Sequence, residues 1–233
     1  MINKKTEFIL IDKKIEADEV VSLFFKSVDN LEYNFIAGQY VNIKSPLGGH
    51  SKSYTISNSP DEEFVRITIK RKGKVSSELS DLNIGDKIFL EGPYGYFYPE
   101  NFNKDIVMIA GGIGITPFKS IIKSLINKNQ KVNVTLFYSN QNIKDITFFE
   151  KLNEITKNNS HIKVINLLTQ EKTKNDSIKE YSRIDKNILK KDLGNFENKN
   201  YFICGSIEFV NSIWKLLKDE GVDELNIFTE SFF

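Results

Sequence analysis

The pattern of apolar and polar positions changes once along the chain. From Thr6 to about Phe102, apolar and polar residues alternate over short segments that end at Gly, Pro, Asn or Asp. Such alternation is typical of strands with one buried face, and closely spaced short strands indicate an antiparallel barrel. The predicted elements are strands at 20–25, 39–43, 52–57, 64–70 and 87–90, with a short helix at 77–82.

After Asn103, short apolar runs alternate with amphipathic segments of helical period. That alternation predicts right-handed βαβ crossovers and a parallel sheet. The polar segment 170–183 has no clear period and is expected to form a mobile loop. The pattern therefore predicts a β-barrel domain at 1–102 and an α/β domain at 103–233. The α/β elements are strands at 106–109, 132–138, 163–168, 201–204 and 225–228, and helices after Pro117 and at 145–156, 186–192 and 207–219.

The composition is that of a globular protein, with 40% hydrophobic residues in a chain of 233. Its 32 basic and 31 acidic residues give a net charge of +1, which does not indicate a nucleic-acid or membrane partner. The sequence has no apolar run long enough to span a membrane, and its charged start differs from a signal peptide. We therefore expect a cytoplasmic protein without membrane insertion or nucleic-acid binding.

Cysteine and histidine are too few for several kinds of site. The single cysteine, Cys204, excludes a disulfide framework and a cysteine-ligated iron–sulfur cluster within this chain. Only His50 and His161 accompany it, so no metal site is expected. Any redox chemistry would then come from an organic cofactor.

A glycine-rich turn, Gly111-Gly112-Ile113-Gly114, separates a predicted strand from a predicted helix. Glycine permits positive φ and lets a ligand approach the backbone closely. Thr116 is expected to cap the helix and Pro117 to lie in its first turn, where no amide partner is needed. Amides at such a helix start suit a pyrophosphate, although the same turn is also a common packing solution in α/β folds.

Two stretches of the β half combine charge, aromatic rings and hydroxyls. Lys52-Ser53-Tyr54-Thr55 offers a cation for phosphate, a ring for stacking and a hydroxyl for a ring nitrogen, which together suit a flat phosphorylated heterocycle. On pattern alone, an ordinary strand with a solvated lysine is the more common explanation. Gly73-Lys74-Val75-Ser76 precedes the predicted short helix and offers amides for a second phosphate, or is simply a hairpin loop turned by Gly73.

Taken together and in this order, these stretches resemble the ferredoxin–NADP reductase family. In that family a flavin-binding barrel carries Arg-x-Tyr-Ser/Thr, then Gly-x-x-Ser and Gly-Pro-Phe/Tyr-Gly. Its nicotinamide domain carries Gly-Gly-x-Gly-x-Thr-Pro, a Cys-Gly-Pro or similar, and a C-terminal Glu-x-aromatic. The matching segments here are Gly38–Val41, Lys52–Thr55, Gly73–Ser76, Gly92–Gly95, Gly111–Pro117, Cys204–Ser206 and Glu230–Phe232. The resemblance implies an N-terminal antiparallel β-barrel flavin domain, a parallel-sheet α/β nicotinamide-nucleotide domain, and FAD and NAD(P)H as cofactors.

The resemblance also assigns roles to residues of the barrel. The motif of Lys52 and Ser53 would contact the flavin, Tyr54 would lie against the isoalloxazine, and Thr55 would hydrogen-bond near flavin N5. The following strand would flank the ribityl region through Ile69 and Lys70. The pyrophosphate of FAD would be held by Gly73, Lys74, Val75 and Ser76.

In the α/β domain the resemblance assigns the nicotinamide nucleotide. Cys204 would sit by the nicotinamide ring, although on pattern alone it could be a small core residue. Glu230 resembles the family's acid close to the reaction centre, so Thr55, Cys204 and Glu230 are the predicted catalytic residues. The cofactor-binding residues of this domain would be Gly111, Gly112, Gly114, Thr116, Pro117, Cys204 and Gly205, with Phe232, or Phe233 in its place, covering the flavin face.

The implied activity moves hydride from NAD(P)H to FAD N5 and passes electrons to a separate acceptor: a ferredoxin, a flavodoxin, an oxygenase component or a small molecule. NADH is favoured because loops 139–142 and 169–171 carry no arginine for a 2′-phosphate, although Lys172 and Lys174 lie nearby. Two other functions stay open: a reductase of diffusible flavin, and a non-catalytic electron-transfer subunit. The family's arginine is Lys52 here, which favours the first, because lysine cannot bind phosphate in bidentate fashion.

Overall fold

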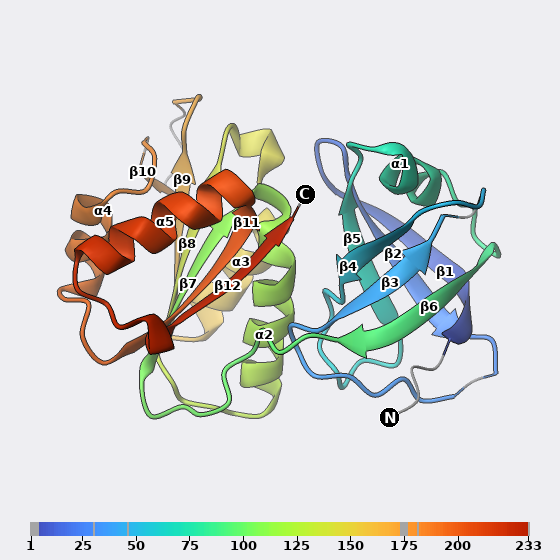
Figure 1. Cartoon of the computed structure of the whole chain (residues 1–233), viewed down its shortest axis with the longest axis horizontal. Coiled ribbons are helices and arrows are strands. Elements are labelled where there is room, and N and C mark those ends of the chain that lie inside the picture. The colour runs from blue at the N-terminus through green and yellow to red at the C-terminus, as the bar shows by residue number, and fades with distance from the viewer. Residues whose placement is uncertain (1–4, 30, 46, 173–176, 181, 233) are drawn as a thin grey trace. The chain divides into compact units, whose positions relative to one another are not determined.

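The computed structural model describes residues 5–29, 31–45, 47–172, 177–180 and 182–232. It divides into two compact units (Figure 1). The barrel unit comprises the described residues up to Tyr98 together with Thr116–Asn129, and the sheet unit comprises Pro99–Ile115 and the described residues from Gln130 onward. The domain boundary at 102/103 stays a prediction, because the two units alternate along the chain instead of meeting at one residue.

All strand pairs of the barrel unit are antiparallel. The strands form one sheet in the order β4-β3-β6-β1-β2-β5. An isolated bridge between Ile56, directly after β4, and Ile67 in β5 joins the two edges, so the predicted antiparallel barrel is confirmed. The strands are β1 (Lys5–Ala17), β2 (Val20–Ser27), β3 (Tyr40–Lys44), β4 (Ser51–Thr55), β5 (Val65–Lys70) and β6 (Lys87–Tyr94).

The core of the barrel unit follows the period of two that the sequence shows. In β1 Phe8 and Leu10 are buried, and in β3 Val41 and Ile43 alternate with more exposed neighbours. Burial of each such side chain contributes about 1.5–3 kcal/mol. The alternation fixes the register of the strands, and therefore which residues of the neighbouring β4 face inward.

Buried polar groups fix the turn that follows β4. The hydroxyls of Ser57 and Thr68 share a hydrogen bond of 2.8 Å, and the Arg66 guanidinium donates to the Ser57 carbonyl at 3.0 Å. The side-chain oxygen of Asn58 accepts from the Arg66 amide at 2.7 Å. Ser120, on helix α2, donates to the Asn58 carbonyl at 2.5 Å. These bonds tie the end of β4 to β5 and to α2.

Helix α2 (Ile115–Asn127) follows the glycine-rich turn, yet most of it belongs to the barrel unit. The rings of Phe97 and Phe118 lie 5.7 Å apart. A Cβ added to Gly38 would lie 3.3 Å from the side chain of Ile121. Packing of this kind, in addition to the Ser120 hydrogen bond, holds the helix on the barrel.

Helix α1 (Lys74–Ser80) begins earlier than the sequence predicted. The Ser76 hydroxyl accepts from the Gly73 amide and donates back to the Gly73 carbonyl, both at 2.9 Å, so the helix starts at this local turn. At the other end, the Lys13 ammonium donates to the carbonyl of Ser80 at 2.7 Å. Lysine at a helix C-terminus is favourable because it faces the unpaired carbonyls.

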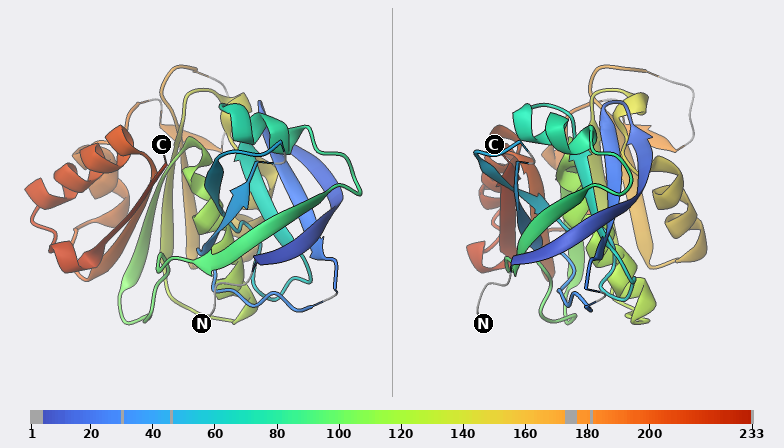
Figure 2. Two further views of the ribbon diagram at one scale, coloured as in Figure 1. Left: turned by 45° about the vertical axis from the view of Figure 1, so that its right-hand side comes forward. Right: turned by 90° about the vertical axis from the view of Figure 1, so that its right-hand side faces the viewer.

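The sheet unit contains one parallel sheet, which confirms the predicted α/β organisation. Its order is β10-β9-β8-β7-β11-β12. Figures 1 and 2 show α4 and α5 on one face of this sheet and α3 on the other. The elements are β7 (Asp105–Gly111), β8 (Val134–Asn140), α3 (Phe149–Asn158), β9 (Ile162–Leu168), β10 (Ile178–Glu180), α4 (Lys186–Leu193), β11 (Lys199–Ser206), α5 (Ile207–Asp219) and β12 (Ile227–Phe232), with short 3-10 turns η1 (Gly112–Gly114), η2 (Ile143–Asp145) and η3 (Glu224–Asn226).

The order of the strands creates a switch point between β7 and β11. The chain runs outward from β7 through β8 and β9, then returns to the other side of β7 as β11 and β12. In open α/β sheets, ligands bind outside the carboxyl ends of the strands at such a point. The glycine-rich turn follows β7, and the Cys204–Gly205 pair lies near the end of β11, so both flank this position.

Several element boundaries differ from the prediction for local reasons. The helix predicted at 145–156 is divided into η2 and α3, because Phe148 takes a φ of 64°. The strand predicted at 225–228 begins only at Ile227, because the Asp223 side chain accepts from the Leu225 amide and starts η3. The predicted loop 170–183 includes the short strand β10. Among the described residues, none of the helices is long and apolar enough to cross a membrane.

Candidate functional site

The glycine-rich turn presses against the end of β11. A Cβ added to Gly114 would lie 2.2 Å from the carbonyl oxygen of Cys204, and one added to Gly205 would lie 2.7 Å from the ring of Phe209. Real Cβ atoms do not approach so closely, so Gly114 requires glycine, and a side chain at position 205 would require the Phe209 ring to move. The structure therefore brings the two predicted glycine segments together at the switch point. Sequence reasoning missed Phe209, whose ring fills the space that two glycines leave.

The predicted capping role of Thr116 is wrong. Helix α2 begins at Ile115 directly after η1, so Thr116 lies inside its first turn. Gly112 takes a φ of +52°, and the chain enters the helix through this left-handed residue. Pro117 lies in the first turn as predicted, where a missing amide removes no helical hydrogen bond. The remaining amides of this turn and the helix dipole suit an anion.

Cys204 and Glu230 are neighbours in register on β11 and β12. Cys204 is fully buried, and burial together with the nearby Glu230 raises the pKa of its thiol well above the usual value. Burial also raises the pKa of the Glu230 carboxyl to about 7. Its Oε2 atom is buried and has no hydrogen-bond partner among the described residues. The pair thus combines a neutral thiol with a carboxyl that can gain or lose a proton near neutral pH.

The last strand carries the predicted aromatic tail. Phe232 is half-buried at the end of β12, where it pairs in register with Ser206 of β11. Ser206 also caps α5, because its hydroxyl accepts from the Phe209 amide at 3.3 Å. Phe233 lies outside the described residues, so its predicted role stays untested. No group of three or more His, Cys, Asp or Glu side chains among the described residues is arranged to hold a metal ion.

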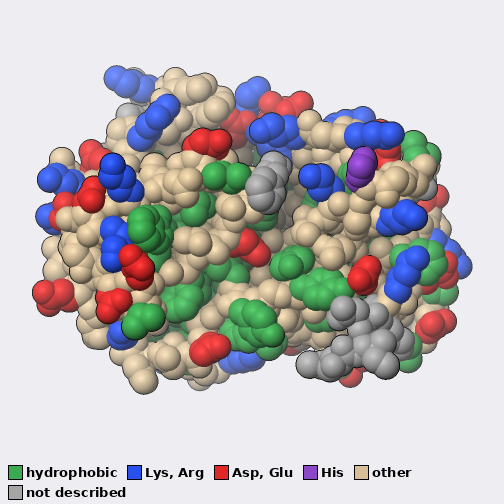
Figure 3. Space-filling view, viewed as in Figure 1, with side chains coloured by type: hydrophobic (Ala, Val, Ile, Leu, Met, Phe, Trp, Pro, Cys, Tyr) green, Lys and Arg blue, Asp and Glu red, His purple; other side chains and the backbone are tan. Residues whose placement is uncertain are grey.

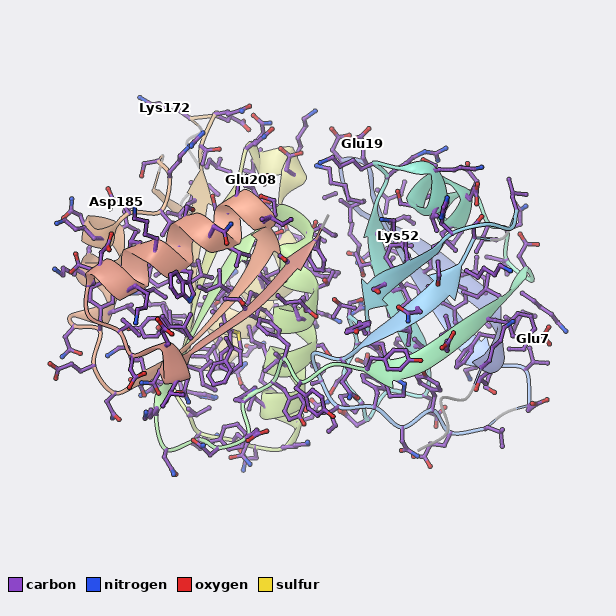
Figure 4. All side chains as sticks on the ribbon, viewed as in Figure 1. Glu7, Glu19, Lys52, Lys172, Asp185 and Glu208 are labelled. Atoms are coloured by element: carbon purple, nitrogen blue, oxygen red, sulfur yellow. The ribbon has the colours of Figure 1, made fainter. Side chains whose placement is uncertain are left out.

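On the barrel unit, the motif residues of β4 become more buried toward the end of the strand. Lys52, labelled in Figure 4, and Ser53 are exposed, and the Ser53 hydroxyl donates to Asn42 at 2.7 Å. Tyr54 is half-buried, and burial raises the pKa of its phenol to about 12. Thr55 is buried, and its hydroxyl has no hydrogen-bond partner among the described residues. A buried hydroxyl of this kind fits a ligand that supplies the missing partner.

The segment predicted to hold the FAD pyrophosphate precedes and opens α1. The Ser76 hydroxyl is already bonded to the amides of Gly73 and Lys72, at 2.9 and 3.1 Å, and therefore shapes the turn. Lys74 is exposed and Val75 is buried. A Cβ at Gly73 would contact nothing within 4 Å, so an approaching ligand has open space there.

The strand before this turn contributes mainly packing. Ile69 is 1% exposed and belongs to the barrel core, so its side chain is not open to a ligand. Lys70 is half-buried and begins a basic run that continues through Arg71, Lys72 and Lys74. Arg71 is bound to Asp81 by two bonds of 2.6 and 2.9 Å. Sequence reasoning did not include Lys72, although the run of cations beside Gly73 was visible. Figure 3 shows Lys and Arg side chains gathered on the face of the barrel unit that carries α1 and β4.

Family models match both halves of the chain. The model of the oxidoreductase FAD-binding domain matches residues 7–98, and that of the oxidoreductase NAD-binding domain matches residues 108–215. The first covers most of the barrel strands, and the second extends from β7 into α5. Together they place a flavin domain before a nicotinamide-nucleotide domain.

Curated proteins with these domains are similar over nearly the whole chain. A flavohemoprotein of Bacillus subtilis is 31% identical, over 97% of this chain and 58% of that protein. NADH-cytochrome b5 reductase 1 of Candida glabrata is 29% identical, over 89% of this chain and 76% of that protein. The chain spans about three fifths of the length of the flavohemoproteins that it matches.

A solved structure shows the same fold. The flavohem-like FAD/NAD binding domain of nitric oxide dioxygenase from Vibrio cholerae superposes with a TM-score of 0.87. The match covers 97% of this chain and 98% of that one, at 24% sequence identity. At that identity the similarity concerns the fold alone, and not the identity of individual site residues.

Proposed function

Because this chain belongs to the family of ferredoxin–NADP reductase-like oxidoreductases with FAD- and NAD-binding domains, we propose that it transfers hydride from NAD(P)H to bound FAD and passes the electrons to a separate acceptor. The chain is an NAD(P)H-dependent oxidoreductase of this family. The observation that carries the proposal is that two of the predicted site residues hold a buried polar atom with no hydrogen-bond partner among the described residues. One is the hydroxyl oxygen of Thr55 in the barrel unit, and the other is the Oε2 atom of Glu230 in the sheet unit.

In the barrel unit, the residues of β4 fit a flavin. FAD, when bound, supplies an acceptor of hydride at N5 that can release electrons singly or in pairs. The Tyr54 ring offers a face for stacking, and the Thr55 hydroxyl offers a hydrogen bond to a ring nitrogen. Lys52 and Lys74, both exposed, offer point charges to phosphate groups. The turn at Gly73 is open enough for a pyrophosphate to approach the backbone.

In the sheet unit, the switch point fits a nicotinamide nucleotide. The turn Gly111–Gly114 and the first turn of α2 present amides to a pyrophosphate, and glycine keeps side chains out of the way. Cys204 and Gly205 would line the place of the nicotinamide ring, and a neutral thiol there would exclude water without adding charge. The Glu230 carboxyl, with its pKa of about 7, would hold or release a proton beside that ring.

We propose that the acceptor lies outside the residues of this chain. With one cysteine, the chain cannot supply the thiolates for an iron–sulfur cluster. A ferredoxin, a flavodoxin, an oxygenase component or a small molecule fits this requirement. The acceptor is found by adding each candidate class to the NADH-reduced protein and following reoxidation of the flavin absorbance.

A reductase that uses flavin as a diffusible substrate is a second candidate. The observation in its favour is Lys52, which is exposed and can offer a phosphate only a point charge. The two functions differ in what the purified protein contains. A bound cofactor predicts a yellow protein that releases FAD on heating and bleaches when NADH or NADPH is added. A colourless protein that reduces added FMN or riboflavin as readily as FAD would support the second candidate and contradict the first.

A further inference from the structure

Two hydrogen bonds join helix α2 to the turn that follows β4, within the barrel unit. The Ser120 hydroxyl donates to the Asn58 carbonyl at 2.5 Å, and the Asn127 side chain donates to the Asp61 carboxylate. The first bond is buried, whereas Asn127 is exposed. Because the two donors lie about two helical turns apart, the bonds fix the direction of the helix as well as its position.

The turn that receives α2 is rigid, because Asn58 uses both polar atoms of its side chain within the barrel. Its Oδ1 atom accepts from the Arg66 amide at 2.7 Å. Its Nδ2 atom donates to the carbonyls of Phe64 and Ser59, at 2.6 and 3.0 Å. Asn58 and Ser120 are both 0% exposed, so bulk water does not replace either partner. A displacement of this turn would therefore displace the helix with it.

The buried bond connects the flavin motif to the start of α2 by a short path. Thr55, whose buried hydroxyl has no partner among the described residues, ends β4 shortly before Asn58. Thr116, in the first turn of α2, lies about 6 Å along the helix from Ser120. The amides that suit a pyrophosphate and the strand that fits a flavin are thus tied together through one hydrogen bond between buried residues.

We propose that Ser120 is a positioning residue, whose bond to the Asn58 carbonyl places the start of α2, and a nucleotide bound there, for hydride transfer to the flavin. The inference rests on the proposed function. The transfer breaks the C4–H bond of the reduced nicotinamide and forms an N5–H bond on the flavin, so the nicotinamide loses two electrons and the flavin gains them. Reacting atoms must approach to about 3–3.5 Å, and a displacement of about 1 Å can lower the rate about 100-fold. Binding of the nucleotide is less sensitive, because the amides that hold it move with the helix.

The experiment compares variants of two buried serines on the same helix. Ser120→Ala removes the bond to Asn58 with the loss of one atom. Ser124→Ala removes the same atom from a buried residue one turn further along α2 and leaves that bond in place, so it is the matched control. Ser120→Cys keeps the shape of the side chain and exchanges the hydroxyl for a weak donor, and it answers the question if Ser120→Ala does not fold.

Three measurements separate position from binding and from packing. Stopped-flow absorbance gives the rate constant for flavin reduction at a saturating concentration of the better nucleotide, NADH or NADPH. Calorimetry gives the Kd for FAD, and for that nucleotide in its oxidised form. Amide hydrogen exchange of α2 in the flavin-free full chain reports how firmly the helix is held when no cofactor is bound.

We expect Ser120→Ala to lower the rate constant about tenfold, as a helix shift of about half an ångström would. Both Kd values should change less than about twofold, which is the pattern of an interaction that affects the transfer step and not binding. The α2 amides should exchange faster in this variant. Ser120→Cys should lie between it and the wild-type protein, and Ser124→Ala should match the wild-type protein in all three measurements.

Four results would overturn the role of Ser120. The first is a wild-type rate constant in Ser120→Ala. The second is an equal loss in Ser124→Ala, since lost packing would then explain both variants. The third is a rise of the Kd values by the factor by which the rate constant falls, since Ser120 would then support binding. The fourth is a wild-type flavin that neither nucleotide reduces, which overturns the proposed function as well, whereas the first three leave the proposed function standing.

Discussion

The two candidate binding sites differ in the kind of group that forms them. The sheet unit offers backbone: at Gly114 an added Cβ would lie 2.2 Å from a carbonyl oxygen, so there is no room for a side chain. The barrel unit offers side chains, and a Cβ at Gly73 would contact nothing within 4 Å. A site built from closely packed backbone tolerates almost no substitution. At a site built from exposed charges, a substitution can raise or lower the affinity for the ligand by a small amount.

The largest effect should come from Gly114→Ala. Because the new Cβ would meet the backbone at Cys204, the turn must move, and a shift of about 1 Å in a positioned ligand can lower rates by about 100-fold. We expect kcat/KM for the nicotinamide nucleotide to fall by about that factor while the flavin content stays unchanged.

The matched variant is Gly73→Ala in the barrel unit, where φ is −137° and alanine fits. We expect it to change the Kd for FAD less than about threefold. If kcat/KM in Gly114→Ala and the affinity for FAD in Gly73→Ala fall by the same factor, the two sites do not differ in their tolerance of substitution.

The next effect concerns the only predicted catalytic acid, Glu230. Its pKa of about 7 predicts that kcat changes with pH around neutrality, since one protonation state of the carboxyl is active. Glu230→Gln should remove this pH dependence and lower kcat by about 100-fold, as measured by stopped-flow reduction of the flavin between pH 5.5 and 9. A wild-type pH profile that persists in the variant would assign the titration to another group.

The same group makes stability depend on pH. A carboxyl whose pKa rises from 4.5 to about 7 on folding binds its proton more tightly in the folded state. The free energy of unfolding should therefore fall as pH rises from about 4.5 to about 7, by up to roughly 3 kcal/mol. Glu230→Gln should flatten this part of the curve, which denaturant titrations at each pH would measure. A slope that the variant retains would show that other groups cause it.

A smaller effect should show whether the affinity of the barrel site for FAD changes in small steps with its exposed charges. Lys52→Arg would allow a second charge-assisted hydrogen bond to phosphate, so we expect FAD binding to strengthen by about 1 kcal/mol. Quenching of flavin fluorescence on binding to the apoprotein measures the change. Lys26→Arg, an exposed position on β2, is the control and should leave the Kd unaltered. Unchanged affinity in Lys52→Arg would mean that this side chain does not contact a phosphate.

The smallest effect should come from Phe232, whose ring either packs against the sheet only or also competes with the nicotinamide ring. If its ring covers the flavin, Phe232→Ala removes a competitor of nicotinamide, so KM and kcat should both fall by about twofold to fivefold. Ser231→Ala, a change at the exposed neighbouring residue, should alter neither constant. Steady-state kinetics and the flavin absorbance spectrum provide the test. Wild-type constants in Phe232→Ala would show that the ring only packs against the sheet.

Periodicity was sufficient to predict the fold class, since the change from period two to helical period marks the change from barrel to α/β sheet. It was also sufficient to place the glycine segments, because Gly111–Gly114 and Cys204–Gly205 each follow an apolar strand. Their mutual contact was not visible, because it depends on Phe209 and on β11 lying next to β7. The raised pKa of Glu230 could not be predicted either, because it results from burial in the folded chain.

Local hydrogen bonds explain most of the remaining differences. The sequence predicted that Thr116 caps α2, but η1 leads directly into the helix and leaves no position for a capping side chain. It placed the start of α1 too late, because the hydrogen bonds between Ser76 and Gly73 begin the helix before the apolar pattern becomes clear. The bond between Glu171 and Ile143 joins two loops far apart in sequence, and no short motif encodes it.

The position of helix α2 has a consequence for the modularity of the chain. The barrel unit takes residues up to Tyr98 and then Thr116–Asn129, while the central strand β7 of the sheet unit lies between these two segments. A division of the chain before β7 would separate the barrel from helix α2, whose Phe118 and Ser120 contact it. A cut after α2 would separate β7 from the rest of its sheet. The two units are thus interleaved, so recombination at a single crossover cannot exchange one of them intact between related proteins.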